Sequence, residues 1–197
     1  MTVCTNDAHQ IVGILLAAGR GRRFIASGGQ NKLLQILPDG VTVLAKSAAI
    51  LSSALPVCVV MREVIPEIDA FIPSGCEMVL CANADQGMAA SLVCGLRQTD
   101  SAAGWVIALA DMPFVKTTTI HALISALQQG VDIAVPTYNG RRGNPVAFSR
   151  HHLSRLLQLD GDQGARSLLR DLPVIEVAVD DPGILQDIDS VADLPQF

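Results

Sequence analysis

The order of apolar runs along the chain constrains its fold more than any other feature. Short apolar runs, such as "IVGILLA" (11–17), "VCVVM" (57–61) and "WVIALAD" (105–111), alternate with segments whose apolar residues recur at helical spacing. A strand that is covered by helices on both faces reads as a nearly continuous apolar run. The alternation therefore predicts an α/β fold with a doubly wound, mostly parallel sheet.

The remaining elements follow from the same periodicities. Expected helices occupy residues 42–55, with Thr42 as N-cap, and 63–72, 87–98, 118–130, 151–159 and 164–172. Further expected strands occupy residues 77–82, 132–138, 144–149 and 174–180. The stretch 138–148 has no helix between its strands, which predicts a small antiparallel excursion from the doubly wound order, such as an antiparallel pair over the site.

Composition limits the kind of protein. The 197 residues suit one domain, 1–197, with a core of about 11–193. A formal net charge of −5 argues against a nucleic-acid partner, and no apolar run reaches the roughly 18 residues of a membrane helix. The five cysteines form no CxxC pair, which favours free thiols in a reducing compartment. With no signal peptide at the N-terminus, we expect a cytoplasmic protein.

In a doubly wound sheet, ligands bind beyond the carboxyl ends of the strands. The first strand is followed by "AGRGRRFIASGGQNK" (18–32), which holds four glycines, Arg20, Arg22, Arg23 and Lys32. Glycine permits positive φ angles and lets phosphate oxygens approach backbone N–H groups. The spacing matches neither a Walker A loop nor GxGxxG. We expect a polyphosphate-binding loop; the alternative is a flexible basic turn.

Aspartates follow two later segments. Asp111 ends an apolar strand, where a carboxylate is costly unless it meets a cation or hydrogen-bond donors. In "DIDSVADL" (187–194), an extended backbone puts Asp187 and Asp189 on the same side. Magnesium takes one or two carboxylates together with substrate phosphates, so Asp111 with either of them is a candidate Mg²⁺ site. A turn aspartate at 111 and a helix cap at 189 are the alternatives.

Two further loops carry candidate binding residues. In "DQGMAASL" (85–92), Gly87 opens a helix whose N–H groups can hold an anion or a base carbonyl, and Ser91 is either a donor or a packed residue. In "GRRGNPVAF" (140–148), a tight charged loop is either a plain connection or the site of a second substrate. The second-substrate candidates are Arg142, Gly143, Asn144 and Pro145.

Taken in order, these motifs resemble the nucleotidyltransferases of the molybdenum cofactor, the MobA-like NTP transferases. The opening "LLAAGRGRRF…NKLL" resembles that family's LAAGxSxRxG…K signature. The later "GMAASL", "ALADMP", "GNPVAF", "GDQGAR" and "DID" resemble its other motifs, and the match runs from about Ile11 to Asp193. The resemblance implies a Rossmann-like nucleotidyltransferase fold.

Within that family, guanylyltransferases usually carry LAGG and cytidylyltransferases LAAG. The motif Ala17-Ala18-Gly19 therefore favours transfer of CMP from CTP to a molybdopterin-type cofactor, with release of pyrophosphate. The product, molybdopterin cytosine dinucleotide, would pass to a molybdenum hydroxylase of the xanthine-oxidase type.

The resemblance also implies roles for particular residues. Arg23, Lys32 and Asp111 would be catalytic, and Asp111 with Asp189 would hold Mg²⁺. The implied nucleotide-binding residues are Leu16, Ala17, Ala18, Gly19, Arg20, Arg23, Lys32, Ala82, Asn83, Gly87 and Ser91.

The first loop departs from the family pattern. The usual RMG is replaced by Arg23-Phe24-Ile25, and "ASGGQN" lengthens the way to Lys32. Lys32 can reach the phosphates if this segment loops out. Two other functions stay open: a nucleotidyltransferase for GTP or for a sugar or alcohol phosphate, and a non-catalytic module that delivers the cofactor to a partner.

Overall fold

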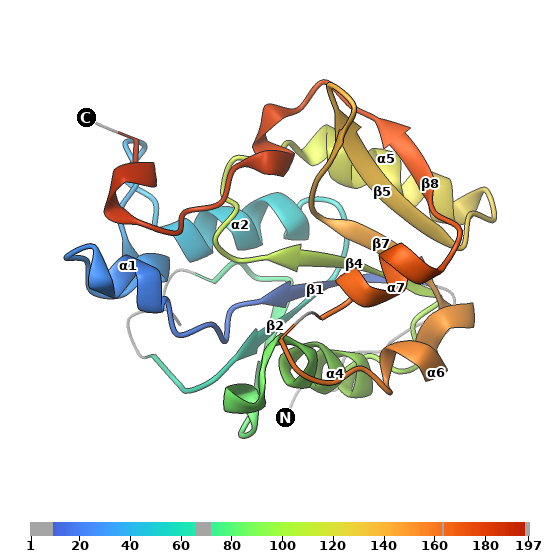
Figure 1. The fold of residues 1–197 in the computed structure, drawn as a ribbon, viewed down its shortest axis with the longest axis horizontal. Coiled ribbons are helices and arrows are strands. Elements are labelled where there is room, and N and C mark those ends of the chain that lie inside the picture. Colours follow the sequence, from blue (N-terminus) through green and yellow to red (C-terminus); the bar gives the residue numbers. More distant parts are fainter. Residues whose placement is uncertain (1–9, 66–71, 163, 196–197) are drawn as a thin grey trace.

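A computed structural model describes residues 10–65, 72–162 and 164–195 of the chain (Figure 1). The strands are β1 Ile11–Leu16, β2 Val57–Met61, β3 Cys76–Leu80, β4 Gly104–Leu109, β5 Ile133–Tyr138, β6 Arg141–Arg142, β7 Val146–Ser149 and β8 Ile175–Ala178. The α-helices are α1 Arg22–Ala26, α2 Val43–Ser52, α4 Met88–Gln98, α5 Thr117–Gln128, α6 Leu153–Leu156 and α7 Arg166–Asp171. The helix expected over 63–72 lies largely in 66–71, outside the described residues.

The strands form one sheet in the order β3-β2-β1-β4-β7-β5-β6, and β8 also pairs with β5. The pairs β1–β2, β1–β4, β2–β3 and β5–β8 are parallel, whereas β4–β7, β5–β7 and β5–β6 are antiparallel. This confirms the doubly wound, mostly parallel sheet with a small antiparallel part. Within that part, β7 lies in the sheet between β4 and β5.

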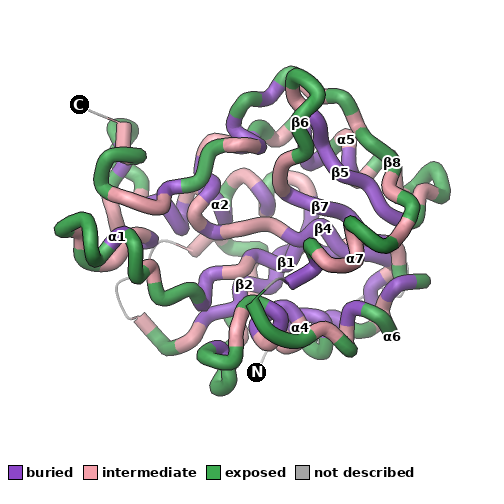
Figure 2. The backbone as a smooth tube through the Cα atoms, viewed as in Figure 1, coloured by how far each residue is buried: buried purple, intermediate pink, exposed green. Residues whose placement is uncertain are grey.

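Helices cover both faces of the sheet. Figure 1 shows α2 and α5 on one face and α4 and α6 on the other. Neighbouring residues of one strand enter opposite layers: Leu15 packs in the α2–α5 layer and Ile14 in the α4–α6 layer, both fully buried. Figure 2 shows buried backbone along the central strands and exposed backbone around α1. Burial on both faces explains why the central strands β1, β2 and β4 have no polar alternation.

Local sequence signals set several helix ends. The Thr42 hydroxyl accepts a hydrogen bond from the Ala45 N–H at 3.3 Å and caps α2, as predicted.

The carboxyl ends of β1, β2 and β4 meet at the side of the sheet that lies beside α1 (Figure 1). Among the described residues, Cys58, Cys76, Cys81 and Cys94 form no disulfide. No helix in the described ranges is both long and apolar enough to cross a membrane.

Candidate active site

The glycine-rich segment after β1 folds into an ordered structure and not into a loose loop. Gly21 takes a φ of 59° and starts the short helix α1, which the sequence did not predict. Phe24 on α1 is fully buried in the α2–α5 layer and anchors the segment. A Cβ on Gly29 would lie 2.1 Å from the Phe24 ring, so glycine is required where the chain passes this side chain. The longer spacing to Lys32 is therefore filled by a helix and a turn.

The turn after α1 brings Lys32 back to the edge of the sheet. The Asn31 side chain accepts a hydrogen bond from the Leu33 N–H at 3.0 Å and caps the short 3-10 helix Lys32–Leu34. The Lys32 side chain is only 12% exposed. Its ammonium group forms an ion pair with Asp111 and lies 3.5 Å from Asp189 Oδ1. The inserted segment thus leaves the lysine in the site.

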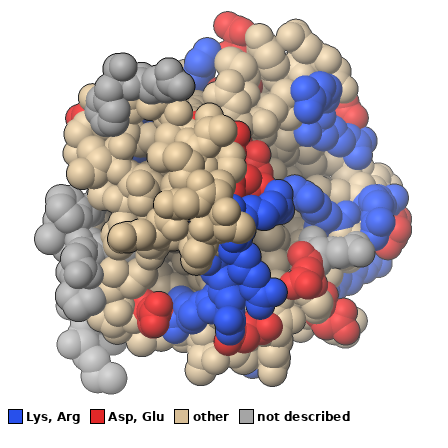
Figure 3. Space-filling model, turned by 60° about the vertical axis from the view of Figure 1, so that its left-hand side comes forward, with Lys and Arg blue, Asp and Glu red and all other residues tan. Residues whose placement is uncertain are grey.

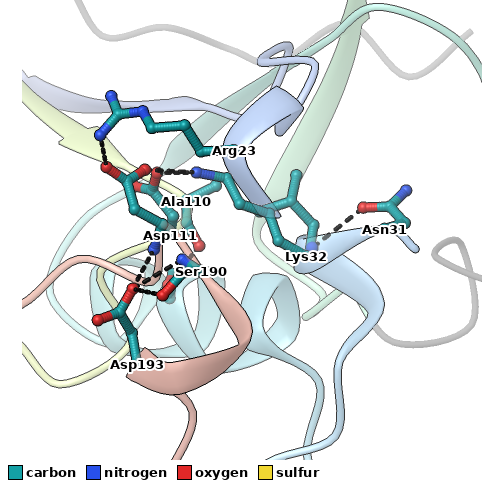
Figure 4. A network of polar contacts seen from close by, with 10 residues as sticks. Arg23, Asn31, Lys32, Ala110, Asp111, Ser190 and Asp193 are labelled. Atoms are coloured by element: carbon teal, nitrogen blue, oxygen red, sulfur yellow. Dashed lines mark hydrogen bonds and ion pairs between the residues drawn. The ribbon is translucent and has the colours of Figure 1, made fainter. Parts of the chain in front are cut away.

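Asp111 and Asp189 come from distant parts of the chain and meet around this lysine. Asp111 follows β4, and the Ile188 N–H donates a 2.9 Å hydrogen bond to its backbone carbonyl. Asp193 accepts from the backbone N–H groups of Asp189 and Ser190 at 3.1 and 2.7 Å and fixes the turn that carries Asp189 (Figure 4). Arg23 reaches Asp189 from α1 (Figure 4).

The two aspartates fit a divalent metal site. Asp111 Oδ1 is buried and has no hydrogen-bond partner among the described residues, whereas Oδ2 faces the Lys32 ammonium. An unpaired buried carboxylate oxygen is costly, and both carboxylates already surround one cation. No three His, Cys, Asp or Glu side chains of the described ranges converge on one point. Two carboxylates suit magnesium, which uses substrate phosphates as further ligands.

A cleft of about 440 Å³ opens over the glycine-rich segment. This volume lies in the range of small-molecule sites, roughly 300–1,000 Å³. Its lining includes Ala17, Ala18, Gly19, Arg20, Gly21, Arg22, Lys32 and Arg62. Figure 3 shows Lys and Arg side chains gathered in a band on the face at the α1 end of the molecule, with acidic side chains beside them. The protein is acidic overall, but this cleft concentrates positive charge.

Arg62 is a site residue that the sequence analysis missed. It directly follows β2, and its Nη2 donates a 2.6 Å hydrogen bond to the Ala18 carbonyl of the first loop. Its Nη1 lies 2.9 Å from Asp85, which also forms a two-bond ion pair with Arg20 at 3.0 and 2.5 Å. The hydrogen bond from Arg20 holds the pKa of Asp85 below its ordinary value. The signal was positional: Arg62 follows the second parallel strand.

The other candidate residues after β3 differ in their exposure. Ala82 and Asn83 are exposed, and Ser91 is buried in α4. Gly87 has a φ of 120°, and a Cβ there would lie 2.5 Å from the Gly161 carbonyl. That carbonyl accepts a 3.0 Å hydrogen bond from the Ala89 N–H. The Ala89 N–H, near the start of α4, is thus already bonded to the "GDQGAR" segment. This contact was not predicted from the sequence.

The loop expected to hold a second substrate divides into two parts. Asn144 and Pro145 line a small cavity together with Leu109 and Met112. Asp111 lies between Leu109 and Met112 in the sequence. The Asn144 N–H donates a 3.0 Å hydrogen bond to the Ile184 carbonyl, which ties the loop down. Arg142 instead lies on β6, is exposed and forms a 2.8 Å ion pair with Glu176 of β8.

The fold and this site define a class. A basic glycine-rich loop after β1 and carboxylates after β4 and near the C-terminus, beside the carboxyl ends of the strands of a mostly parallel sheet, are typical of α/β enzymes that handle nucleoside phosphates. The model of the MobA-like NTP transferase domain matches residues 13–177 of the chain. The protein therefore belongs to this family and is a nucleotidyltransferase.

Individual relatives agree with this assignment. The purine catabolism protein PucB of Bacillus subtilis is 30% identical over 194 residues, covering 91% of this chain and 92% of that protein. The structure of Rv0371c from Mycobacterium tuberculosis has a TM-score of 0.80 and 30% identity, covering 94% of this chain and 96% of that one. A nucleotidyl transferase from Methanothermobacter, Mth528, has a TM-score of 0.76 and 25% identity, covering 93% and 94%.

Proposed function

We propose that the protein transfers CMP from CTP to a molybdopterin-type molybdenum cofactor and releases pyrophosphate. One observation carries the proposal: Lys32 lines the cleft together with loop backbone and arginines, and its ammonium group pairs with Asp111 and lies 3.5 Å from Asp189. This arrangement supports a site in which cations bind phosphates and the neighbouring carboxylates hold a metal. Nucleotidyl transfer requires both in one place.

The residues of the chain act by positioning and by neutralising charge. Backbone N–H groups of the first loop, with Arg20, Arg23 and Lys32, would bind the triphosphate. Asp111 and Asp189 would hold Mg²⁺, which when bound neutralises phosphate charge and makes the α-phosphorus easier to attack. Lys32 would contact the phosphates after its ammonium group exchanges Asp111 for a phosphate oxygen.

The acceptor needs no general base, because its terminal phosphate is already an anion. An oxygen of this phosphate attacks the α-phosphorus in line, the bond to the bridging oxygen breaks, and pyrophosphate leaves with that electron pair. The anchored Asn144–Pro145 segment, beside the end of β4, would place the acceptor next to Asp111. The rate gain then comes from orientation and charge stabilisation.

Three further points support the details. Ala17-Ala18-Gly19 follows the cytidylyltransferase form of the first motif, which supports CTP. The relative PucB is named for purine catabolism, and the expected receiver of the product, a hydroxylase of the xanthine-oxidase type, oxidises purines. A second structure of Rv0371c, with a TM-score of 0.74 and 28% identity over 93% of this chain and 95% of that one, is a complex with manganese, which supports a divalent metal.

A nucleotide panel tests the proposal. Purified protein, Mg²⁺ and isolated molybdenum cofactor are mixed with CTP, GTP, ATP or UTP, and pyrophosphate release is measured. We expect CTP to be preferred at least about tenfold, with no release without the acceptor. A preference for GTP would identify a guanylyltransferase. CTP binding without turnover would favour a module that delivers the cofactor.

A further inference from the structure

The carboxylate of Asp85 occupies a point on which two guanidinium groups converge. Arg20 donates to both of its oxygens, at 3.0 and 2.5 Å, and Arg62 donates to Oδ1 at 2.9 Å. The three residues follow β1, β2 and β3, so the cluster runs along the edge of the sheet beside the cleft. Arg20 and Arg62 line the cleft. Donors that converge on one carboxylate also suit a phosphate group.

We propose that Arg20 and Arg62 form a phosphate-binding position of the nucleotide cleft, and that Asp85 fills this position until a polyphosphate displaces it. The inference rests on the proposed nucleotide function and adds Arg62 and Asp85 to that site. It makes Arg62 a binding residue and Asp85 an internal competitor of the substrate.

The three side chains differ in how firmly they are held. Arg62 is 27% exposed, and the Ala18 carbonyl holds its other terminal nitrogen at 2.6 Å. This bond keeps the guanidinium at the loop when Asp85 leaves. Asp85 is 54% exposed, and within the described ranges its side chain bonds to the two arginines. Exposed ion pairs contribute little stability, so an anion with several charges can replace the carboxylate.

The cluster is separate from the metal-site carboxylates. Asp111 and Asp189 form ion pairs with Lys32 and Arg23. Asp85 instead forms ion pairs with Arg20 after β1 and Arg62 after β2. Each cationic group in these two clusters thus has an internal anion. A polyphosphate that enters the cleft must exchange with Asp85, and this exchange lowers affinity for any phosphate ligand that cannot contact both arginines.

The test measures binding of inorganic tripolyphosphate to the full-length protein by calorimetry without metal. Asp85→Asn should tighten binding by roughly two- to fivefold, the range that an exposed ion pair supplies. Arg62→Gln should weaken it by about tenfold, because a charge-assisted contact is lost. Asp39→Asn is the matched control: it removes one exposed carboxylate from its 2.5 Å pair with Lys46, outside the cleft, and should leave binding unchanged.

The outcomes separate the possibilities. Equal or weaker binding by Asp85→Asn would overturn the role of Asp85 as a competitor, and unchanged binding by Arg62→Gln would overturn the phosphate position. A gain in Asp39→Asn equal to that in Asp85→Asn would assign the effect to net charge and also overturn the proposal. Thermal unfolding of each variant checks that it is folded. Tripolyphosphate contains no nucleobase, and its binding requires no acceptor substrate. The binding result can therefore be interpreted even if the CTP panel fails.

Discussion

Asp187 and Asp189 show how two identical residues, two positions apart, differ in chemistry. Asp189 pairs with Lys32 and Arg23, whereas Asp187 is exposed, and no ion pair of the described residues includes it. From the sequence, either could complete a metal site with Asp111. The turn closed by Ser190 and Asp193 favours Asp189, because it fixes the backbone of this residue.

We predict that Asp189→Asn lowers nucleotidyl transfer by at least about a hundredfold and weakens Mn²⁺ binding, because the site loses one of two anionic ligands. Asp187→Asn is the matched control and should keep both properties. Turnover is followed by pyrophosphate release and Mn²⁺ binding by electron paramagnetic resonance. If the two variants lose activity equally, the aspartates do not have separate roles.

Asp111→Ala should abolish transfer and leave the fold intact, because Asp111 is a proposed metal ligand and not a core residue. Loss of the carboxylate also removes the ion pair of Lys32 and the unpaired buried oxygen, so the net cost in stability should be small. Pyrophosphate release and thermal unfolding give the two readouts. Near-normal turnover would remove Asp111 from the metal site.

At the scale of elements, the apolar runs predicted every strand of the described residues except β6, which consists of the exposed Arg141 and Arg142. The bounds of β2 match the expected 57–61, because a strand buried on both faces has apolar side chains throughout. Helix α1 was missed because its segment is rich in glycine and arginine, and its single buried anchor, Phe24, has no periodic partner. Contacts between distant segments, such as Arg62 with Asp85, leave no local pattern to read.

Helix α1 depends on the close approach of Gly29 to Phe24. Gly29→Ala should lower the free energy of unfolding by about 1–3 kcal/mol, because the new methyl group overlaps the buried ring. Gly19→Ala in the same segment is the stability control, since a Cβ there has no atom within 4 Å. Denaturant unfolding compares the two. Equal free energies of unfolding for the two variants would mean that α1 can shift away from the core to accommodate the methyl group.

Helix α5 has an N-terminal cap from a distant residue. Asp181 is 1% exposed and accepts hydrogen bonds from the Lys116 N–H at 2.8 Å and the Thr119 hydroxyl at 2.6 Å, both at the start of the helix. Asp181→Ala should cost about 2–4 kcal/mol of stability, because buried donors lose their acceptor. Asp180→Ala, at an exposed neighbour, should stay within about 0.5 kcal/mol. Denaturant midpoints at constant slope measure both.

For the whole molecule, one buried histidine couples folding to pH. His152 is 8% exposed, and its ring packs edge-on against Phe148 with the ring centroids 6.1 Å apart. Its Nδ1 has no hydrogen-bond partner among the described residues. Burial lowers the pKa of His152 below 6.5, and nearby Arg155 and His151 lower it further, against the opposing charge of Asp132. The folded protein therefore keeps this ring neutral where the unfolded chain protonates it.

The sign of the pH effect follows from proton binding. Below about pH 6.5 the unfolded chain binds a proton at His152 that the folded protein does not. The free energy of unfolding therefore falls as the pH decreases through this range, whereas the contribution of the neutral ring to stability is fully present above it. His152→Leu should flatten the fall in unfolding temperature between pH 7.5 and 5, since it removes the titrating ring and its unpaired nitrogen. His121→Gln, at an exposed position on α5, should keep the wild-type slope. Parallel curves for His152→Leu and wild type would mean that another group causes the acid sensitivity.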